Sequence, residues 1–140
     1  VEELYKAAKQ GVKIKMIIRG ICCLIPENEK NIEVISVVDR FLEHTRFFIF
    51  NNNGKNETYI SSADWMTRNL DNRVEVTCPI LDKSINDEIN DIFNIYWSDN
   101  IKSRRINTEI PNQYQSNPKS KKGIRSQIEI YNYYKLKLEK

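Results

Sequence analysis

The residues best suited to chemistry lie between Asp39 and Glu75, a stretch that holds the single histidine of the chain, His44. Six further polar residues of this stretch have side chains that could assist it: Arg46, Ser61, Ser62, Asp64, Arg68 and Glu75. An imidazole exchanges protons near neutral pH, and the planar fork of an arginine binds two phosphate oxygens at once. Phosphoryl transfer needs both kinds of group around the phosphate.

A predicted hairpin brings these residues together. The segments 46–50 (RFFIF) and 58–62 (TYISS) are rich in aromatic and β-branched residues, and the turn sequence Asn-Asn-Gly at 52–54 separates them. In an antiparallel pair with this turn, facing residues have numbers that sum to about 107. The pairing predicts that Arg46 lies near Ser61 at the open end of the hairpin.

The same register places His44 near Ala63 and Asp64. A carboxylate behind the ring would fix its tautomer, and either Asp64 or Glu75 could serve. The alternative is that His44 is a hydrogen-bonded structural residue at the entrance of a strand. Ser61 and Ser62 would in that case satisfy backbone groups at the strand end, and even beside a catalytic His44 their roles would be indirect.

Arg19 is a further candidate, from an earlier part of the chain. The segment 12–18 (VKIKMII) reads as a strand, and Arg19 follows it at the carboxyl end, where open α/β sheets bind their ligands. The alternative is a surface arginine that caps a loop.

The order of the predicted elements indicates an α/β fold with a mixed sheet flanked by helices. The expected strands are 12–18, 32–38, 46–51, 57–62 and 73–78. A first helix is expected to begin near Val1 and stop at Gly11, and a short helix or turn is expected at 63–70. A helix opening at Ser84 reaches Trp97, and an amphipathic helix from Ile124 to Leu138 closes the chain.

The chain is expected to comprise an α/β domain at 1–97, followed at 98–140 by a basic extended segment and a helix that pack on it. The basic residues of the last third are Lys102, Arg104, Arg105, Lys119, Lys121, Lys122 and Arg125. Such a cluster suits salt-dependent binding of a polyanion without recognition of a nucleotide sequence. A solvated surface segment is the competing interpretation.

Composition sets the broad class. The chain has 140 residues, 40% of them hydrophobic and 29% charged, and a net charge of +3. Its apolar runs are shorter than a membrane span. Three cysteines without metal-ligand spacing, Cys22, Cys23 and Cys78, predict reduced thiols in a cytoplasmic protein. The chain opens on Val1 inside a predicted helix, which suggests a piece of a longer protein.

The residues around His44 resemble the half-site of the phospholipase D superfamily, in which His-x-Lys enters a strand and Gly-Ser-x-Asn-x-x-x-Arg and a Glu follow. The matching residues here are His44-Thr45-Arg46, the segment from Ser61 to Arg68, and Glu75. Arg46 stands in place of Lys, Asn51 in place of an Asp, Ser61 in place of Gly, and Asp64 in place of Asn.

With these differences, the sequence resembles a narrower family, the last catalytic-core domain of bacterial polyphosphate kinase (type 1). The segments that carry the resemblance are RGICCLIP at 19–26, VVDRFLEHTR at 37–46, YISSADWMTRNLD at 59–71 and RVEV at 73–76. The resemblance runs from about Gly11 to the end of the chain.

The resemblance implies an enzyme that reversibly transfers the terminal phosphate of ATP to polyphosphate through a phosphohistidine in the preceding domain. It implies that Arg19 and His44 contact the nucleotide phosphates, with His44 as a candidate acid or base and Glu75 as the preferred carboxylate behind it. Arg46 and Arg68 would bind phosphate, while Ser61, Ser62, Asp64 and Glu75 would support the site.

The same resemblance implies several partners. They are ATP or ADP, Mg²⁺ carried with ATP and without an identified ligand in this chain, polyphosphate, the preceding domains, and further copies of the full-length enzyme. It implies no specific nucleic acid, and it leaves membrane association of the full-length enzyme open.

Two other functions compete with this one. The first is a stand-alone phosphodiesterase or nuclease of the phospholipase D superfamily that completes its cleft by dimerisation. Arg46 and Asp64, which replace the usual Lys and Asn, count against it. The second is a non-enzymatic module that binds polyanions through its basic tail.

Overall fold

A computed structural model describes residues 1–26, 29–107, 113–115 and 123–139, and the chain divides into two compact units. The first unit comprises residues 1–43 and 94–140, and the second comprises residues 44–93. The segment 98–140 thus groups with the beginning of the chain, and helix α3 (Lys83–Trp97) contributes residues to both units.

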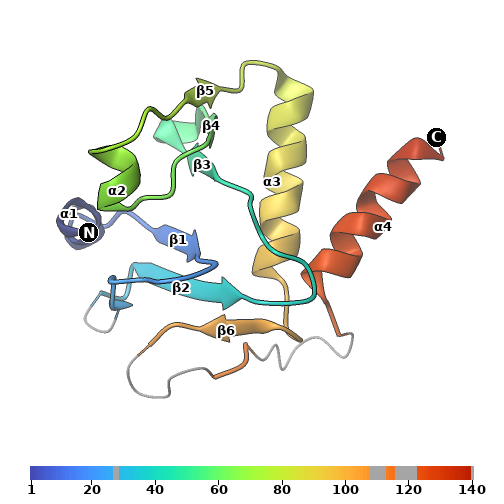
Figure 1. The fold of residues 1–140 in the computed structure, drawn as a ribbon, viewed down its shortest axis with the longest axis horizontal. Helices are drawn as coiled ribbons and strands as arrows, with labels where there is room; N and C mark the ends of the chain where they lie inside the picture. The colour runs from blue at the N-terminus through green and yellow to red at the C-terminus, as the bar shows by residue number, and fades with distance from the viewer. Residues whose placement is uncertain (27–28, 108–112, 116–122, 140) are drawn as a thin grey trace. The chain divides into compact units, whose positions relative to one another are not determined.

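The first unit contains a three-stranded mixed sheet in the order β1-β2-β6 (Figure 1). Strand β1 (Ile14–Ile17) runs parallel to β2 (Ile32–Val37), with Ile14 opposite Ile32. Strand β6 (Ser103–Arg105) pairs antiparallel with the other edge of β2. The expected position of β2 in the middle of a sheet, with both faces covered, is confirmed by its burial pattern.

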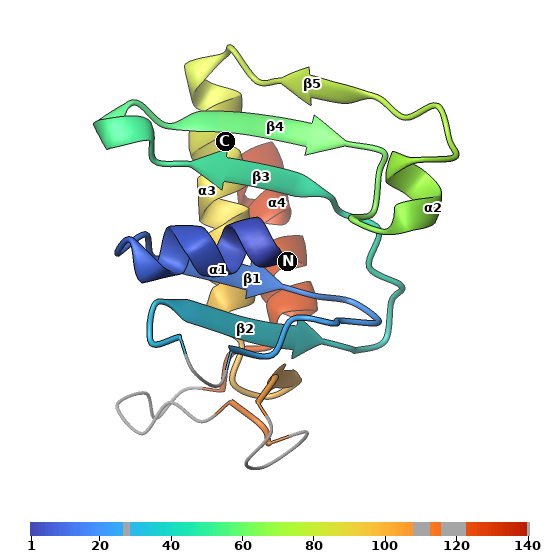
Figure 2. The ribbon, with the colours of Figure 1, turned by 90° about the vertical axis from the view of Figure 1, so that its left-hand side faces the viewer.

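Helix α1 (Glu2–Lys9) lies across β1, as Figure 2 shows, and contributes Ala8 to the core of this unit. The buried residues of this core are Ala8, Leu24, Ile32 and Val34, with Leu4, Tyr5, Ile14, Met16, Ile18, Cys22 and Ile106 packed against them. The helix ends as expected before Gly11, whose φ of +93° is favourable for glycine.

The second unit contains an antiparallel sheet in the order β3-β4-β5, with α3 behind it (Figure 2). Strands β3 (Phe47–Phe50) and β4 (Glu57–Ser61) form the expected hairpin around the turn η2 (Asn52–Gly54). Phe47 pairs with Ile60 and Phe50 with Glu57, so the predicted register is confirmed. The turn has positive φ at Asn52, Asn53 and Gly54, residue types that tolerate this conformation.

The α/β class is confirmed, while three details of the expected fold are wrong. The described strands form two three-stranded sheets instead of one mixed sheet. Strand β5 spans only Thr77–Pro79, because Val74 and Val76, the residues expected on its apolar face, are exposed. Strand β6 was not expected, because its sequence Ser-Arg-Arg carries no apolar signal.

The helices also differ from expectation in their ends and faces. Helix α3 begins at Lys83 instead of Ser84, because Asp82 accepts hydrogen bonds from the N–H groups of Ser84 and Ile85. The short segment expected after the hairpin contains helix α2 (Thr67–Leu70). Helix α4 (Ser126–Leu138) forms where expected. Its apolar face is not buried in this chain, because Tyr131 and Leu138 are exposed.

A buried carboxylate fixes the start of α4 in the first unit. The side chain of Asp99 is fully buried. Its Oδ1 atom accepts backbone hydrogen bonds from Ile101, Lys102 and Ser103 at 2.9, 2.7 and 3.1 Å. Its Oδ2 atom accepts from the backbone N–H and the hydroxyl of Ser126, both at 2.7 Å. Asp99 therefore caps α4 from a distant segment.

We expect Asp99→Asn to lower the free energy of unfolding by about 2 kcal/mol at pH 7, because an amide nitrogen would then face the donors of Ser126. Burial opposes ionisation of Asp99, but the hydrogen bonds from Ser126, Lys102 and Ser103 outweigh it and lower the pKa of the carboxyl. With a lowered folded-state pKa, the stabilisation is present above the unfolded value near 3.8 and is lost as the pH falls through the folded value.

Urea unfolding of this chain between pH 7 and pH 3 measures the effect. The difference between wild type and Asp99→Asn is expected to shrink as the solution becomes acidic. The exposed Asp71→Asn variant is the control and is expected to unfold like wild type at every pH. A difference that grows toward acid pH would contradict this assignment of Asp99.

Candidate active site

Arg46 and Asp64 form a two-pronged ion pair at the open end of the hairpin. The Nε and one terminal nitrogen of Arg46 donate to the two oxygens of Asp64 at 2.8 and 3.2 Å. The side chains are 19% and 21% exposed, so water screens the pair only in part. The hydrogen bond to Asp64 raises the pKa of Arg46 further, and its charge is permanent.

Arg46 also holds the backbone beside the histidine. Its remaining terminal nitrogen donates to the carbonyl oxygen of His44 at 3.1 Å, and its own carbonyl accepts from the N–H of Ser61 at 3.0 Å. The expected proximity of Arg46 and Ser61 is therefore confirmed. Three of the five N–H donors of the guanidinium are used in these contacts, which leaves two that could face a phosphate.

Glu75 is held on the following segment by two side chains. Its carboxylate accepts hydrogen bonds from the hydroxyl of Ser62 and, at 2.7 Å, from the amide of Asn69. These hydrogen bonds, of which the one from Ser62 has the larger effect, lower the pKa of Glu75 and keep its carboxylate ionised. Asn69 is buried on α2 and was not predicted as a site residue; its place directly after Arg68 was the only signal in the sequence.

The two serines bind neighbouring groups. The hydroxyl of Ser62 accepts from the N–H of Val76 at 3.0 Å. The hydroxyl of Ser61 accepts from the N–H of Ala63 at 3.1 Å and shares a hydrogen bond of 2.9 Å with the hydroxyl of Thr77. The two serines therefore connect the end of β4 with residues 75–77, at the start of β5.

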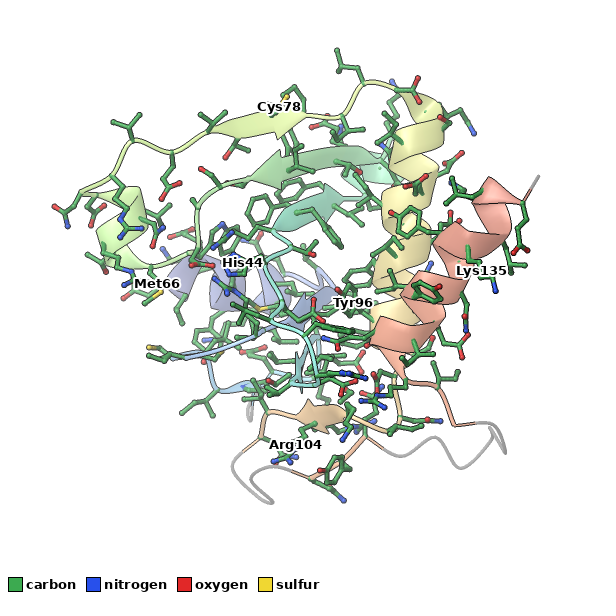
Figure 3. All side chains as sticks on the ribbon, turned by 45° about the vertical axis from the view of Figure 1, so that its right-hand side comes forward. His44, Met66, Cys78, Tyr96, Arg104 and Lys135 are labelled. Atoms are coloured by element: carbon green, nitrogen blue, oxygen red, sulfur yellow. The ribbon has the colours of Figure 1, made fainter. Side chains whose placement is uncertain are left out.

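His44 lies on the segment that enters β3, where Figure 3 labels it. Its side chain is exposed. The two carboxylates considered for the position behind the ring are engaged elsewhere, Asp64 by Arg46 and Glu75 by Ser62 and Asn69. The side chain of His44 is therefore accessible from solvent in this chain. Arg68 is likewise exposed, on helix α2.

In the first unit, Arg19 follows β1 as expected and is half-buried. Its terminal nitrogen donates to the carbonyl oxygen of Glu43 at 2.9 Å. Glu43 directly precedes His44 in the sequence, so Arg19 holds the peptide that leads into the histidine. The carboxylate of Glu43 accepts hydrogen bonds of 2.6 Å from Tyr96 and from Gln127.

The basic tail is only partly described. Lys119, Lys121 and Lys122 lie outside the described residues. Of the described cations of this segment, Arg125 is bound to Asp39 and Arg104 stacks on the ring of Tyr114. Within the described ranges, no group of three His, Cys, Asp or Glu side chains could hold a metal ion, and no helix is long and apolar enough to cross a bilayer. The three cysteines are free, as expected.

Comparison with known proteins places these residues in a family. The family model for the polyphosphate kinase C-terminal domain 2 matches residues 1–127. The chain is 51% identical over 138 residues to a polyphosphate kinase of Vibrio vulnificus (strain YJ016) and 46% identical to one of Escherichia coli (strain K12). Each match covers 96% of this chain and 20% of the relative, so the chain spans about a fifth of their length.

A solved structure agrees with the sequence matches. The crystal structure of polyphosphate kinase from Porphyromonas gingivalis superposes with a TM-score of 0.94 at 48% identity, over 99% of this chain and 22% of that one. These matches confirm the resemblance seen in the motifs and the fold class expected from it.

Proposed function

Because the chain belongs to the polyphosphate kinase C-terminal domain 2 family, we propose that it is part of an enzyme that reversibly moves the terminal phosphate of ATP onto polyphosphate. One observation supports the role of this domain above all. The imidazole of His44 is exposed, while the chain before and after it is held by hydrogen bonds. Arg19 binds Glu43, the preceding residue, and Asp64 binds Arg46, two residues further on. An exposed proton carrier on a fixed backbone suits catalysis.

The proposed reaction exchanges a phosphorus–oxygen bond of ATP for a phosphorus–nitrogen bond, and the later transfer to polyphosphate replaces that bond with a new phosphorus–oxygen bond. The bond between the γ-phosphorus and the bridging oxygen of ADP breaks, and the phosphorus forms a bond to the acceptor, a histidine of another domain that later passes the phosphoryl group to polyphosphate. His44 donates a proton to the leaving oxygen and takes it back in the reverse direction. Arg19, Arg46 and Arg68 supply positive charge to the phosphate oxygens.

Magnesium enters this proposal as part of the substrate, MgATP. Mg²⁺ keeps several waters and binds phosphate oxygens readily, so it needs few protein ligands. Of the carboxylates at the hairpin end, Asp64 is neutralised by Arg46, and Glu75 is occupied by Ser62 and Asn69. Asp64 and Glu75 therefore do not fit the role of magnesium ligands. We assign Asp64 to the support of Arg46, and Glu75 to the support of the strand ends.

This chain alone is expected to fold but to transfer no phosphate, because it carries one half-site and the reaction is proposed to need a second. The measurement is formation of polyphosphate from radiolabelled ATP by the 140-residue chain, with a full-length polyphosphate kinase that carries this domain as the positive control. ATP-dependent synthesis by the isolated chain would contradict the division into half-sites.

The alternatives from sequence analysis make different predictions. A phosphodiesterase would hydrolyse a generic bis-ester such as bis(p-nitrophenyl) phosphate and lose that activity on His44→Ala. A polyanion-binding module would be insensitive to His44→Ala and would lose affinity when Lys119, Lys121 and Lys122 become Ala. The relatives of Vibrio vulnificus and Escherichia coli are polyphosphate kinases, which favours the kinase proposal over both.

A further inference from the structure

The segment that leads into His44 has no regular secondary structure. Residues 38–46 lie between β2 and β3 and belong to no helix or strand. The apolar side chains of this segment do not hold it in place, because Phe41 is 60% exposed and Leu42 is 78% exposed. Its position must therefore depend on polar contacts made by other segments.

Gln127 of α4 binds the middle of this segment. Its amide nitrogen donates to the carbonyl of Phe41 at 2.8 Å, and its amide oxygen accepts from the N–H of Phe41 at 2.9 Å. One buried side chain thus satisfies both backbone groups of Phe41, as a neighbouring strand would. The contact joins residues 86 positions apart in the chain.

The end of the segment is held at three atoms of Glu43. The same amide nitrogen of Gln127 donates to one carboxylate oxygen of Glu43 at 2.6 Å, and the hydroxyl of Tyr96 donates to the other at 2.6 Å. Arg19 binds the carbonyl oxygen at 2.9 Å. Tyr96 is buried on the last turns of α3, where Figure 3 labels it. Glu43 therefore has little freedom just before His44.

The beginning of the segment is held by Arg125, the residue before α4. Two nitrogens of its guanidinium donate to the two oxygens of Asp39 at 2.7 and 2.6 Å. The side chain of Asp39 is only 2% exposed, so the pair is shielded from water on that side. The start of α4 is itself fixed through Ser126 by the buried Asp99.

We propose that Gln127 and Arg125, at the start of α4, are positioning residues that hold residues 39–43 and thereby fix the peptide that leads into His44. The inference rests on the proposed role of His44. It assigns to the start of the closing helix a task in catalysis, although neither residue is proposed to touch the substrate. A misplacement of about 1 Å can cost about 100-fold in rate, so loss of one clamp is expected to be visible in turnover.

The first test is steady-state kinetics of the full-length enzyme with Gln127→Ala. We expect kcat to fall about tenfold while KM for ATP changes less than about threefold, because the substrate contacts themselves remain. The control is Gln115→Ala, which removes a half-buried amide that binds the carbonyl oxygens of Trp97 and Asp99. Gln115→Ala is expected to leave kcat within about twofold of wild type.

The second test does not depend on activity. Because His44 is the single histidine of this chain, its imidazole gives one Cε1–H signal in the NMR spectrum. Gln127→Ala is expected to shift or broaden this signal in the 140-residue chain, and Gln115→Ala is expected to leave it unchanged. If Gln127→Ala does not fold, Arg125→Lys takes its place in the test. This variant keeps the positive charge but loses the two-pronged contact of the guanidinium with Asp39, and kcat is expected to fall about threefold.

Two outcomes separate this inference from the proposed function. If Gln127→Ala behaves like Gln115→Ala in both kcat and the His44 signal, the start of α4 does not position the histidine and the inference is overturned. If His44→Ala itself leaves the enzyme fully active, the proposed function fails. The NMR comparison then still decides whether Gln127 fixes the place of His44.

Discussion

Replacing His44 with Ala in the full-length enzyme is expected to lower kcat for polyphosphate synthesis by about 10²- to 10⁴-fold, the usual contribution of a positioned acid or base. The side chain is exposed on a held backbone, so its removal should change the chemistry more than the fold. His44→Gln keeps a hydrogen-bond donor without the ability to exchange protons at neutral pH. If it is as inactive as His44→Ala, proton transfer is the lost function.

The control for this prediction is Thr45→Ala, an exposed neighbour that has no assigned role. It is expected to retain wild-type kcat. An unchanged kcat in both His44 variants would remove His44 from the proposed mechanism.

Arg19→Ala is expected to lower kcat/KM for ATP by at least about 100-fold for two reasons. The variant loses a cation proposed to contact the nucleotide phosphates, and it releases the carbonyl oxygen of Glu43 beside His44. Arg19→Lys keeps the charge but cannot form the same fork, so it should recover only part of the loss.

Arg105→Ala is the matched control for Arg19, because Arg105 is an exposed arginine of the same unit with no role in the proposed site. Its kcat/KM for ATP is expected to stay within about twofold of wild type. Equal losses in Arg19→Ala and Arg105→Ala would indicate a general effect of positive charge on ATP binding, and would contradict a specific role for Arg19.

Local sequence predicted the hairpin well, because its determinants are local. Three residues that tolerate positive φ fix the turn, and the turn fixes which residues face each other. The prediction that Arg46 lies at the end of the hairpin beside Ser61 followed directly. Helices α1 and α3 were also predictable, since their apolar spacing and the glycine or acidic residues at their ends are visible in the sequence.

The contacts that hold the site could not be predicted in the same way. Gln127 and Glu43 are 84 positions apart, and Arg125 and Asp39 are 86 apart, so no periodic pattern connects them. Asn69 binds Glu75 across a loop whose path no propensity specifies. Polar residues give no burial signal in a sequence, and their partners become visible only when the fold brings the segments together.

The measurement that tests the central claim most directly is polyphosphate synthesis from ATP by the full-length enzyme, comparing wild type, His44→Ala, Arg19→Ala and the double variant after each has been shown to be folded. We predict that both single variants lose at least about 100-fold, and that the double variant loses less than the product of the two, because both residues serve one phosphoryl transfer. Near-normal synthesis by both single variants would contradict the account.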